Sequence, residues 1–131
     1  MLDILRRIVQ DINATRDLNE ALNLIVAEVK AALHTDVCSV YITDPVRGEH
    51  VLMATDGLRP GAVGKVRLKL GQGLTGLAAG RVEPINVENA LAHPAFRYIA
   101  VTGEVLFHGF IGVPILRRRK VLGVLVAQQR E

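Results

Sequence analysis

The spacing of the apolar residues changes once along this chain, close to His34, from the period of a helix to the period of a strand. Before His34, apolar residues recur every three or four positions, which predicts helical structure. After it, apolar and polar residues alternate and β-branched residues become frequent, which predicts strands. Helices followed by a run of short strands are typical of an α+β layer fold, in which the helices cover one face of an antiparallel sheet.

The region before His34 predicts two helices. An apolar stripe favours a first helix over residues 2–13, and its members are Leu2, Leu5, Ile8, Val9 and Ile12. Asp17 and Glu20 have the spacing of a capping box, which indicates that a second helix begins there and runs to about residue 33. We therefore expect two N-terminal helices on one face of the sheet.

The rest of the chain predicts about six strands and one short helix. The strands are expected at residues 37–43, 50–55, 65–70, 83–87, 109–116 and 121–129, with the short helix at 73–80. Lysines and an arginine alternate along the third strand, at Lys65, Arg67 and Lys69, as in protected edge strands. Residues 57–64 form a loop, and residues 89–109 hold only short helical turns.

The strands predict two different faces for the sheet. A bulky apolar face should receive the helices, and its members are Cys38, Val40, Ile42, Ile111, Val113 and Ile115. The opposite face then needs a second cover. Only the connection from Gly57 to Gly109 is available for this, so we expect that connection to lie across the sheet as a lid.

The opposite face is the predicted ligand site. Ser39, Tyr41 and Thr55 provide hydroxyl groups there, and Gly112 removes side-chain volume beside Phe110. Four polar residues are expected above this space, namely Asn86, His93, Arg97 and Tyr98, and the guanidinium of Arg97 can pair a carboxylate with two hydrogen bonds. These features predict a pocket for a small anionic molecule. In the alternative interpretation, Tyr98 and Phe96 anchor the lid to a filled core and Arg97 lies in solvent.

Composition limits the class of protein. The 131 residues fit one domain, and the single cysteine, Cys38, excludes an internal disulfide and a multi-thiolate metal site. We found no apolar run of the ~20 residues that span a bilayer, and no signal peptide. We therefore expect a domain of the reducing cytoplasm that does not associate with a membrane.

The net charge of +3 comes from one segment. Arg117 to Lys120 are four consecutive cations, and without them the net charge would be +3 − 4 = −1. Five aromatic residues and one local basic cluster do not match the broad basic face or the stacking rings of a nucleic-acid-binding protein. The cluster is expected to be a solvated hairpin tip or, alternatively, a docking patch for an acidic partner.

The remaining motifs do not indicate a dinucleotide site, a metal site or a catalytic residue. Gly71, Gly73 and Gly76 have the spacing of a dinucleotide fingerprint, but the preceding strand is amphipathic and basic, so we interpret them as a tight turn into a helix. The four histidines are far apart in the sequence, which argues against a zinc site; a haem-binding histidine is the alternative to ordinary surface histidines. No nucleophile motif is present, so we expect no catalytic residue.

Five segments together resemble the GAF domain family: VCSVYITD, VLMATDGL, GQGLTGLAA, EPINV with AHPAFRY, and GFIGVPILRRRKVLGVLVAQQRE. The chain is most similar to the GAF domains at the N-terminus of nitrogen-type enzymes I of the phosphotransferase system, which are phosphoenolpyruvate-protein phosphotransferases. The resemblance implies a GAF fold over residues 1–131, a regulatory and non-catalytic role, and attached phosphotransferase domains. It suggests glutamine or 2-oxoglutarate as the sensed metabolite.

The same resemblance also implies differences from other GAF domains. GAF domains of this kind end with a long helix after the last strand, so the chain is expected to be truncated before it. The cyclic-nucleotide NKFDE pattern, a bilin-attaching cysteine and the several cysteines of GAF-type methionine sulfoxide reductases are absent. The alternative function is a ligand-free module that forms a homodimer or binds another protein through its helical layer.

Overall fold

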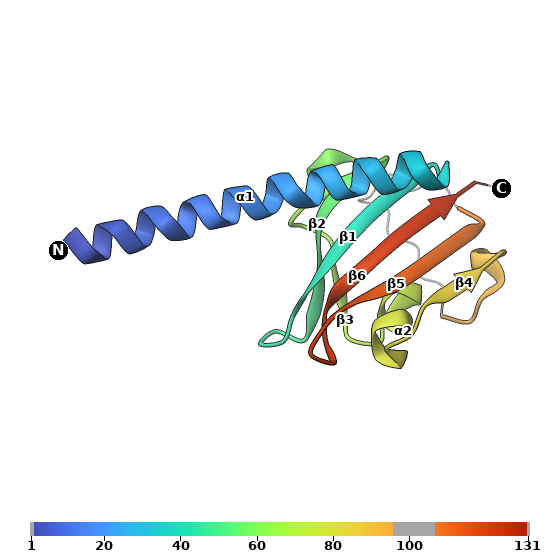
Figure 1. The fold of residues 1–131 in the computed structure, drawn as a ribbon. Coiled ribbons are helices and arrows are strands. Elements are labelled where there is room, and N and C mark those ends of the chain that lie inside the picture. Colours follow the sequence, from blue (N-terminus) through green and yellow to red (C-terminus); the bar gives the residue numbers. More distant parts are fainter. Residues whose placement is uncertain (1, 96–106, 131) are drawn as a thin grey trace.

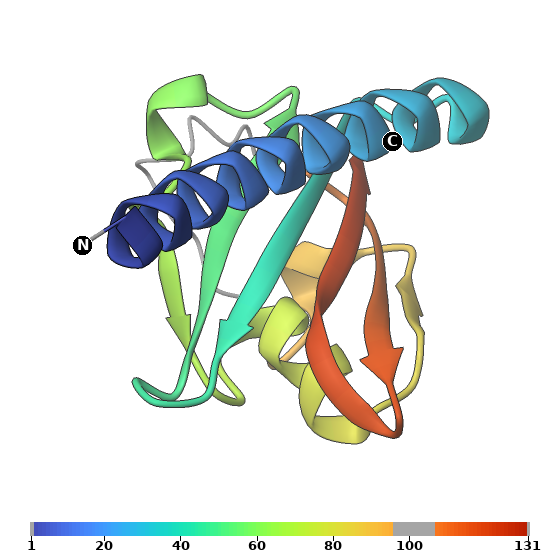
Figure 2. The same ribbon diagram turned by 60° about the vertical axis from the view of Figure 1, so that its left-hand side comes forward.

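The computed structural model describes residues 2–95 and 107–130, without the side chains of Asp11, Ile12 and Thr15. The fold is α+β, with a six-stranded antiparallel sheet in the order β3-β2-β1-β6-β5-β4. Figures 1 and 2 show one long helix across one face of the sheet and a short helix on the other. The predicted fold class is thus confirmed.

The N-terminal region is one helix, α1 (Leu2–Leu33), so the prediction of two helices is wrong. No glycine or proline interrupts this region, and every residue from 13 to 17 can continue the i→i−4 hydrogen bonds. The capping pattern at Asp17 and Glu20 therefore lies inside a continuous helix, where Glu20 forms an i,i+4 ion pair with Arg16 at 3.9 Å. The helix ends where His34 adopts a left-handed φ of 55°.

The six strands agree with the predicted order. Their bounds are β1 (Val37–Asp44), β2 (Glu49–Asp56), β3 (Arg67–Lys69), β4 (Ile85–Val87), β5 (Gly109–Arg117) and β6 (Lys120–Gln129). The third and fourth strands are the two edges of the sheet, and the alternating cations of the third strand had predicted its edge position. Both edge strands are three residues long, shorter than predicted. Gly71 follows β3 with a left-handed φ of 80°, and Pro84, which has no amide hydrogen for the ladder, precedes β4.

The helix-facing side of the sheet carries a small core. Leu22 and Val26 of α1 pack there against Cys38, Val40 and Ala54, with Ile42 and Ile115 at the margin. A bulge in β2 opposite Val40 and Tyr41 directs both Met53 and Ala54 towards the helix. The predicted assignment of the bulky strand faces to the helical layer is confirmed for these residues.

The opposite side carries a larger core beneath the connection between β2 and β5. This connection holds α2 (Gly73–Arg81) and two 3₁₀ turns, η1 (Pro60–Ala62) and η2 (Ala90–Ala92). Its buried side chains include Leu58, Val66, Leu74, Ala78 and Ile85, which pack on Tyr41, Leu52, Phe110, Val124 and Val126 of the sheet. The expected lid is therefore present. We use "lid" below for the described part of residues 57–109.

Helix α1 extends well beyond the sheet. Its C-terminal half lies on β1 and β2, whereas its N-terminal half projects from the domain (Figure 1). Among the described residues, no helix combines the length and the apolar content that crossing a membrane requires.

Candidate functional site

The lid-facing side of β1 and β2 carries a row of polar groups. The antiparallel register places Ser39 opposite Thr55, and Thr43 opposite His50. Tyr41 lies between these pairs and belongs to the core under the lid. Because alternate residues of a strand share a face, these side chains form one polar row on the side away from α1. We call Ser39, Tyr41, Thr43, His50 and Thr55 the polar row.

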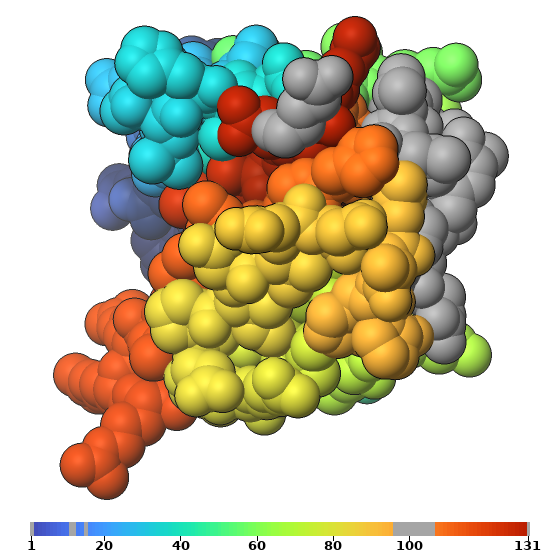
Figure 3. Space-filling view, turned by 90° about the vertical axis from the view of Figure 1, so that its right-hand side faces the viewer, coloured from blue at the N-terminus to red at the C-terminus, as the bar shows by residue number. Residues whose placement is uncertain are grey.

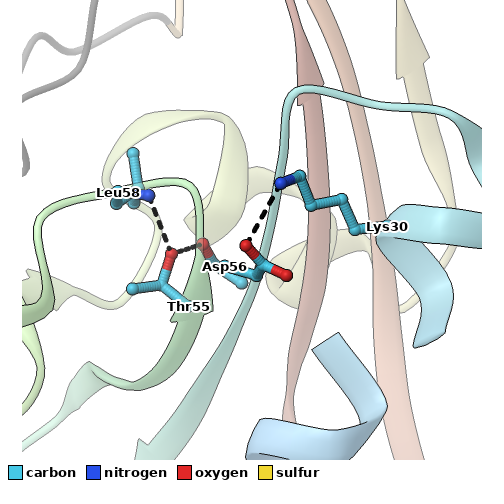
Figure 4. Close-up of polar contacts among 5 residues, drawn as sticks. Lys30, Thr55, Asp56 and Leu58 are labelled. Carbon is cyan, nitrogen blue, oxygen red and sulfur yellow. Dashed lines mark hydrogen bonds and ion pairs between the residues drawn. The ribbon is translucent and has the colours of Figure 1, made fainter. Parts of the chain in front are cut away.

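The Ser39 end of the polar row is occupied by internal hydrogen bonds. Ser39 is fully buried, and its Oγ lies 2.9 Å from Oγ1 of Thr55. Oγ1 of Thr55 also accepts a hydrogen bond from the Leu58 amide at 3.3 Å, which ties the start of the lid to the sheet (Figure 4). These two predicted site residues therefore lie together, as expected, and they anchor the lid to the strand.

His50 at the other end is the residue that sequence analysis missed. Its side chain is only 1% exposed, and its Nδ1 lies 2.9 Å from Oγ1 of Thr43. Nε2 is buried without a hydrogen-bond partner in the described part of the chain. Burial lowers the pKa of His50, which favours the neutral imidazole. The alternation of the hairpin, which places His50 opposite Thr43, could have predicted that His50 lies on the lid-facing side. The sequence prediction instead treated all four histidines as surface residues.

The notch predicted beside Gly112 is filled. A Cβ built on Gly112 would lie 2.8 Å from Cε1 of Phe110 and 3.3 Å from Cβ of Ala78. Phe110 itself is buried in the core under the lid. Both residues face the lid as predicted, but the absent side chain of the glycine makes room for the phenyl ring, so the expected hollow is not there.

Asn86 lies on the opposite face from the polar row, so its predicted place over the site is wrong. It pairs with Ile111, and its neighbour Ile85 is the residue that enters the core under the lid. The strand alternates strictly here, which turns Asn86 towards the side of α1.

Of the other lid residues predicted for the site, His93 follows η2. Its Nδ1 accepts a hydrogen bond from the Ala95 amide at 3.0 Å. Arg97 and Tyr98 lie outside the described residues.

Asn86 lines a groove of about 340 Å³ instead. The groove is lined by residues of β4, β5 and β6 and by Thr35, two residues after the end of α1. Its walls include Glu88, Ile111 and Gln129. Oγ1 of Thr35 is buried without a hydrogen-bond partner in the described part of the chain. This groove is a hollow that the residue pattern did not predict.

The glycine motif forms a turn, as interpreted from the sequence. Gly71 and Gly73 have left-handed φ values of 80° and 70°, and Gly73 begins α2. A Cβ on Gly76 would lie 2.7 Å from the carbonyl carbon of Gly71, so the helix packs directly on the turn.

Cys38 is buried on the helix side of the sheet. Burial raises the pKa of its thiol to about 11; a backbone hydrogen bond at Ser39 opposes this shift, and the Asp56 carboxylate adds to it. The thiol is therefore protonated at neutral pH, which fits the predicted role as a small core residue.

Comparisons with known proteins give one consistent family. The family model of the GAF domain matches residues 17–131. A protein of Escherichia coli described as phosphoenolpyruvate-dependent phosphotransferase system is 47% identical over 121 residues, which cover 92% of this chain and 16% of that protein. The chain therefore corresponds to a small part of this relative.

Two solved structures show the same fold. The GAF domain from a phosphoenolpyruvate-protein phosphotransferase of Coxiella burnetii is 50% identical, with a TM-score of 0.84, and the alignment covers 100% of this chain and 78% of that one. A free methionine-R-sulfoxide reductase of Neisseria meningitidis in complex with its substrate is 26% identical, with a TM-score of 0.74, over 86% of this chain and 63% of that one.

Proposed function

The chain belongs to the GAF domain family, and from this premise we propose that it is the regulatory domain of a nitrogen-related phosphoenolpyruvate-protein phosphotransferase. The observation that carries this proposal is the 47% to 50% identity to such proteins over at least 92% of the chain. Phosphotransfer would be the activity of other domains of a longer cytoplasmic protein. This domain would bind a small metabolite and change their activity.

We place the metabolite beneath the lid, next to the polar row. The fold neighbour from Neisseria meningitidis was solved in complex with its substrate, which supports a binding role for this architecture. In the polar row, Nε2 of His50 is buried and forms no hydrogen bond within the described part of the chain. If the Thr43 hydroxyl donates to Nδ1, then Nε2 carries the hydrogen and can donate to a carboxylate.

Glutamine and 2-oxoglutarate are the metabolites to test, because both carry a carboxylate and report nitrogen status. Isothermal titration calorimetry of the chain with each compound should give saturable binding for one of them. We expect the His50→Leu variant to bind that compound at least about tenfold more weakly, since a charge-assisted hydrogen bond would be lost. His108→Gln, a change at an exposed histidine, is the matched control and should leave binding unchanged.

Absence of binding by both metabolites at millimolar concentration would remove this version of the proposal. Equal weakening by the His50 and His108 variants would remove His50 from the site and leave the regulatory role to be tested with other compounds.

A second function is supported by the exposed apolar surface of α1. In the half that projects from the sheet, Leu5, Ile8 and Val9 are 54%, 49% and 55% exposed. An isolated helix of this length is marginally stable in water, so this half should require a packing partner. We propose that α1 pairs with α1 of a second copy, which would make the domain a homodimerisation module.

Sedimentation equilibrium tests this pairing. The chain should associate reversibly, and Ile8→Gln should weaken the association by about tenfold or more, since a buried apolar contact would be replaced by an amide. Val46→Gln is the matched control, because Val46 is 93% exposed in the β1–β2 turn, away from α1. A monomer at all concentrations would reject the module.

We also propose that the long helix implied by the resemblance packs on the α1 side of β5 and β6. Val113 is 37% exposed there, and Ile111 lines the open groove. A longer fragment that includes the residues after position 131 should show slower amide exchange in β5 than this chain does. Unchanged exchange would contradict this placement.

A further inference from the structure

The tip of the β5–β6 hairpin is a two-residue turn made of two arginines. Arg117 and Lys120 form the last pair of the ladder, and Arg118 and Arg119 connect them. Both connecting residues have left-handed backbone angles, with φ of 51° and 67°. Two consecutive positive φ values are the requirement of a type I′ turn, for which asparagine and glycine are the favoured residues.

This choice of residues is unfavourable for the backbone. Side chains with a Cβ are strained in the left-handed region, and arginine lacks the short polar group that helps asparagine there. Nothing in folding requires arginine at either position, since Asn-Gly would form the same turn with less strain. Strain of this kind is characteristic of segments that have a binding role.

The four side chains are free for such a role. Arg117, Arg118, Arg119 and Lys120 are all exposed, and among the described residues none of them forms an ion pair. The tip projects from the surface of the molecule at the lower left of Figure 3. Their combined charge is therefore presented to solvent at one protruding point.

The topology places more cations at the same end of the sheet. The registers of the strands place the β1–β2 turn, the start of β6 and the end of β3 at this end. Helix α2 lies at the same end of the molecule (Figures 1 and 2). The additional cations are Arg47, Lys69 and Arg81. Of the nearby carboxylates, Asp44 accepts hydrogen bonds from the β1–β2 turn and Glu49 pairs with Arg67 at 4.0 Å.

The neighbouring side chains indicate a protein partner. Leu116 and Leu122, in the same hairpin, are 47% and 39% exposed. Arginine combined with exposed apolar side chains is typical of protein–protein interfaces. The described aromatic side chains, Tyr41, Phe107 and Phe110, are all buried, so this end offers no described ring for stacking on nucleic-acid bases.

We propose that this basic end of the sheet, centred on Arg117–Lys120, is a docking site for an acidic surface of a protein. The guanidinium groups would form bidentate hydrogen bonds with aspartate and glutamate side chains, with Leu116 and Leu122 in apolar contact beside them. The site is independent of metabolite binding under the lid and of pairing through α1.

The test uses a fluorescently labelled oligo-glutamate peptide as the probe and measures fluorescence anisotropy at low salt. The chain should bind the probe, and added sodium chloride should weaken binding through screening. Arg118→Asn with Arg119→Gly should weaken binding by about tenfold or more, because two central charges are removed from the site. The same variant should unfold at a higher urea concentration, because an Asn-Gly turn relieves the strain.

The matched control removes the same number of charges elsewhere. Arg6→Gln with Arg7→Gln takes two exposed arginines from the projecting half of α1 and should change probe binding less than twofold, since α1 lies away from the hairpin tip. The proposal is overturned if the wild-type chain does not bind the probe or if both variants weaken binding equally. Tighter binding of a DNA duplex, or of phosphatidylserine vesicles, at the same salt concentration would assign the site to nucleic acid or membrane instead.

Discussion

At the scale of single residues, Gly112 and Phe110 pack as a unit on the lid-facing side of β5. The sequence pattern predicted a hollow beside Phe110, whereas the phenyl ring occupies the space that the glycine leaves. The glycine therefore lets the phenyl ring of Phe110 occupy the space beside position 112. A glycine at this position is compatible with an empty hollow and with a space filled by a ring. Only the orientation of Phe110 distinguishes the two.

Replacing Gly112 with alanine tests this packing. The new methyl group would lie 2.8 Å from the ring of Phe110, so we expect a loss of about 1 to 3 kcal/mol in the free energy of unfolding. Urea denaturation of the variant and the wild type measures this difference. An unchanged or higher stability would show that free space exists on that face after all.

Cys38 should be chemically inert while the domain is folded. Its thiol is buried and its pKa is raised to about 11, so little thiolate exists at pH 8. We expect a disulfide reagent to label Cys38 at least about a hundredfold more slowly in the folded domain than in the urea-unfolded chain. The reason is that the reactive thiolate is accessible only after unfolding. Rapid labelling of the native protein would contradict the described burial.

The same residue should make the stability depend on pH only in the alkaline range. Because the thiol binds its proton more tightly in the folded state, its contribution is complete below the ordinary thiol pKa of 9.0 and is lost as pH rises towards about 11. The free energy of unfolding of Cys38→Ala should therefore decrease less than that of the wild type over this interval. Parallel pH curves for the two proteins would refute the shifted pKa.

His50 should make the domain sensitive to acid. Its pKa is lowered from 6.5 by burial, so the unfolded chain takes up a proton that the folded chain resists. The stability it contributes is present above pH 6.5 and is lost as pH falls through its lowered pKa. His50→Leu should reduce the decline in unfolding free energy below pH 6.5, measured by urea denaturation at several pH values.

His108→Gln is the control for the acid experiment, because His108 is exposed. This variant shows how much of any change comes from replacing a histidine that is not buried. An identical acid response in His50→Leu would mean that His50 is not the group responsible.

At the scale of elements, the sheet-bound half of α1 has two faces with different surroundings. Val26 is 1% exposed against the sheet, whereas Leu24, two residues earlier, is 60% exposed. We expect Val26→Ala to cost about 2 to 3 kcal/mol because it leaves a cavity beside Val40 and Ala54. Leu24→Ala should change stability by less than about 0.5 kcal/mol.

Thermal or urea unfolding of these two variants compares the two environments within one turn of the same helix. Similar losses for both would show that the outer surface of α1 is also covered, as a dimer through this part of the helix would require.

At the scale of the whole molecule, a single sheet joins the two cores. The core with α1 and the core under the lid are on opposite faces of the same β1, β5 and β6 strands. Loss of either core would remove support from the same strands, so we expect one cooperative unfolding transition. Near-UV circular dichroism reports the lid side, because the described aromatic residues Tyr41, Phe107 and Phe110 all lie there.

The prediction is that Val26→Ala, a change on the α1 side, shifts the near-UV and far-UV transitions in urea to the same extent. Separate transitions would show that the two layers unfold independently.

The strands and their order along the chain, the edge position of β3 and the division of side chains between two faces followed from the sequence, because alternation and turn residues are local properties. The order of the strands within the sheet came only from the structure. Cys38, Val40 and Ile42 faced the helix as their alternation required. The number of helices did not follow, since the pattern at Asp17 and Glu20 is equally compatible with a helix start and with an exposed helix surface.

The candidate site was only partly predictable, because a local residue pattern is compatible with more than one arrangement. Ser39, Tyr41 and Thr55 lie on the predicted face, whereas Asn86 lies on the other one. Thr43, the hydrogen-bond partner of His50, is only seven residues away and pairs with it in the β1–β2 hairpin. The burial of His50 also depends on segments packed against this hairpin, such as β3, where Leu68 pairs with His50.

The order of apolar and polar residues alone thus determined the class of fold and which face of each central strand meets the helix, since a strand with two different sides has one favourable orientation on a core. Tertiary structure decided what occupies the space between the elements. Whether a glycine leaves a hollow or receives a ring, and whether a histidine is solvated or buried, depends on side chains brought together from separate segments.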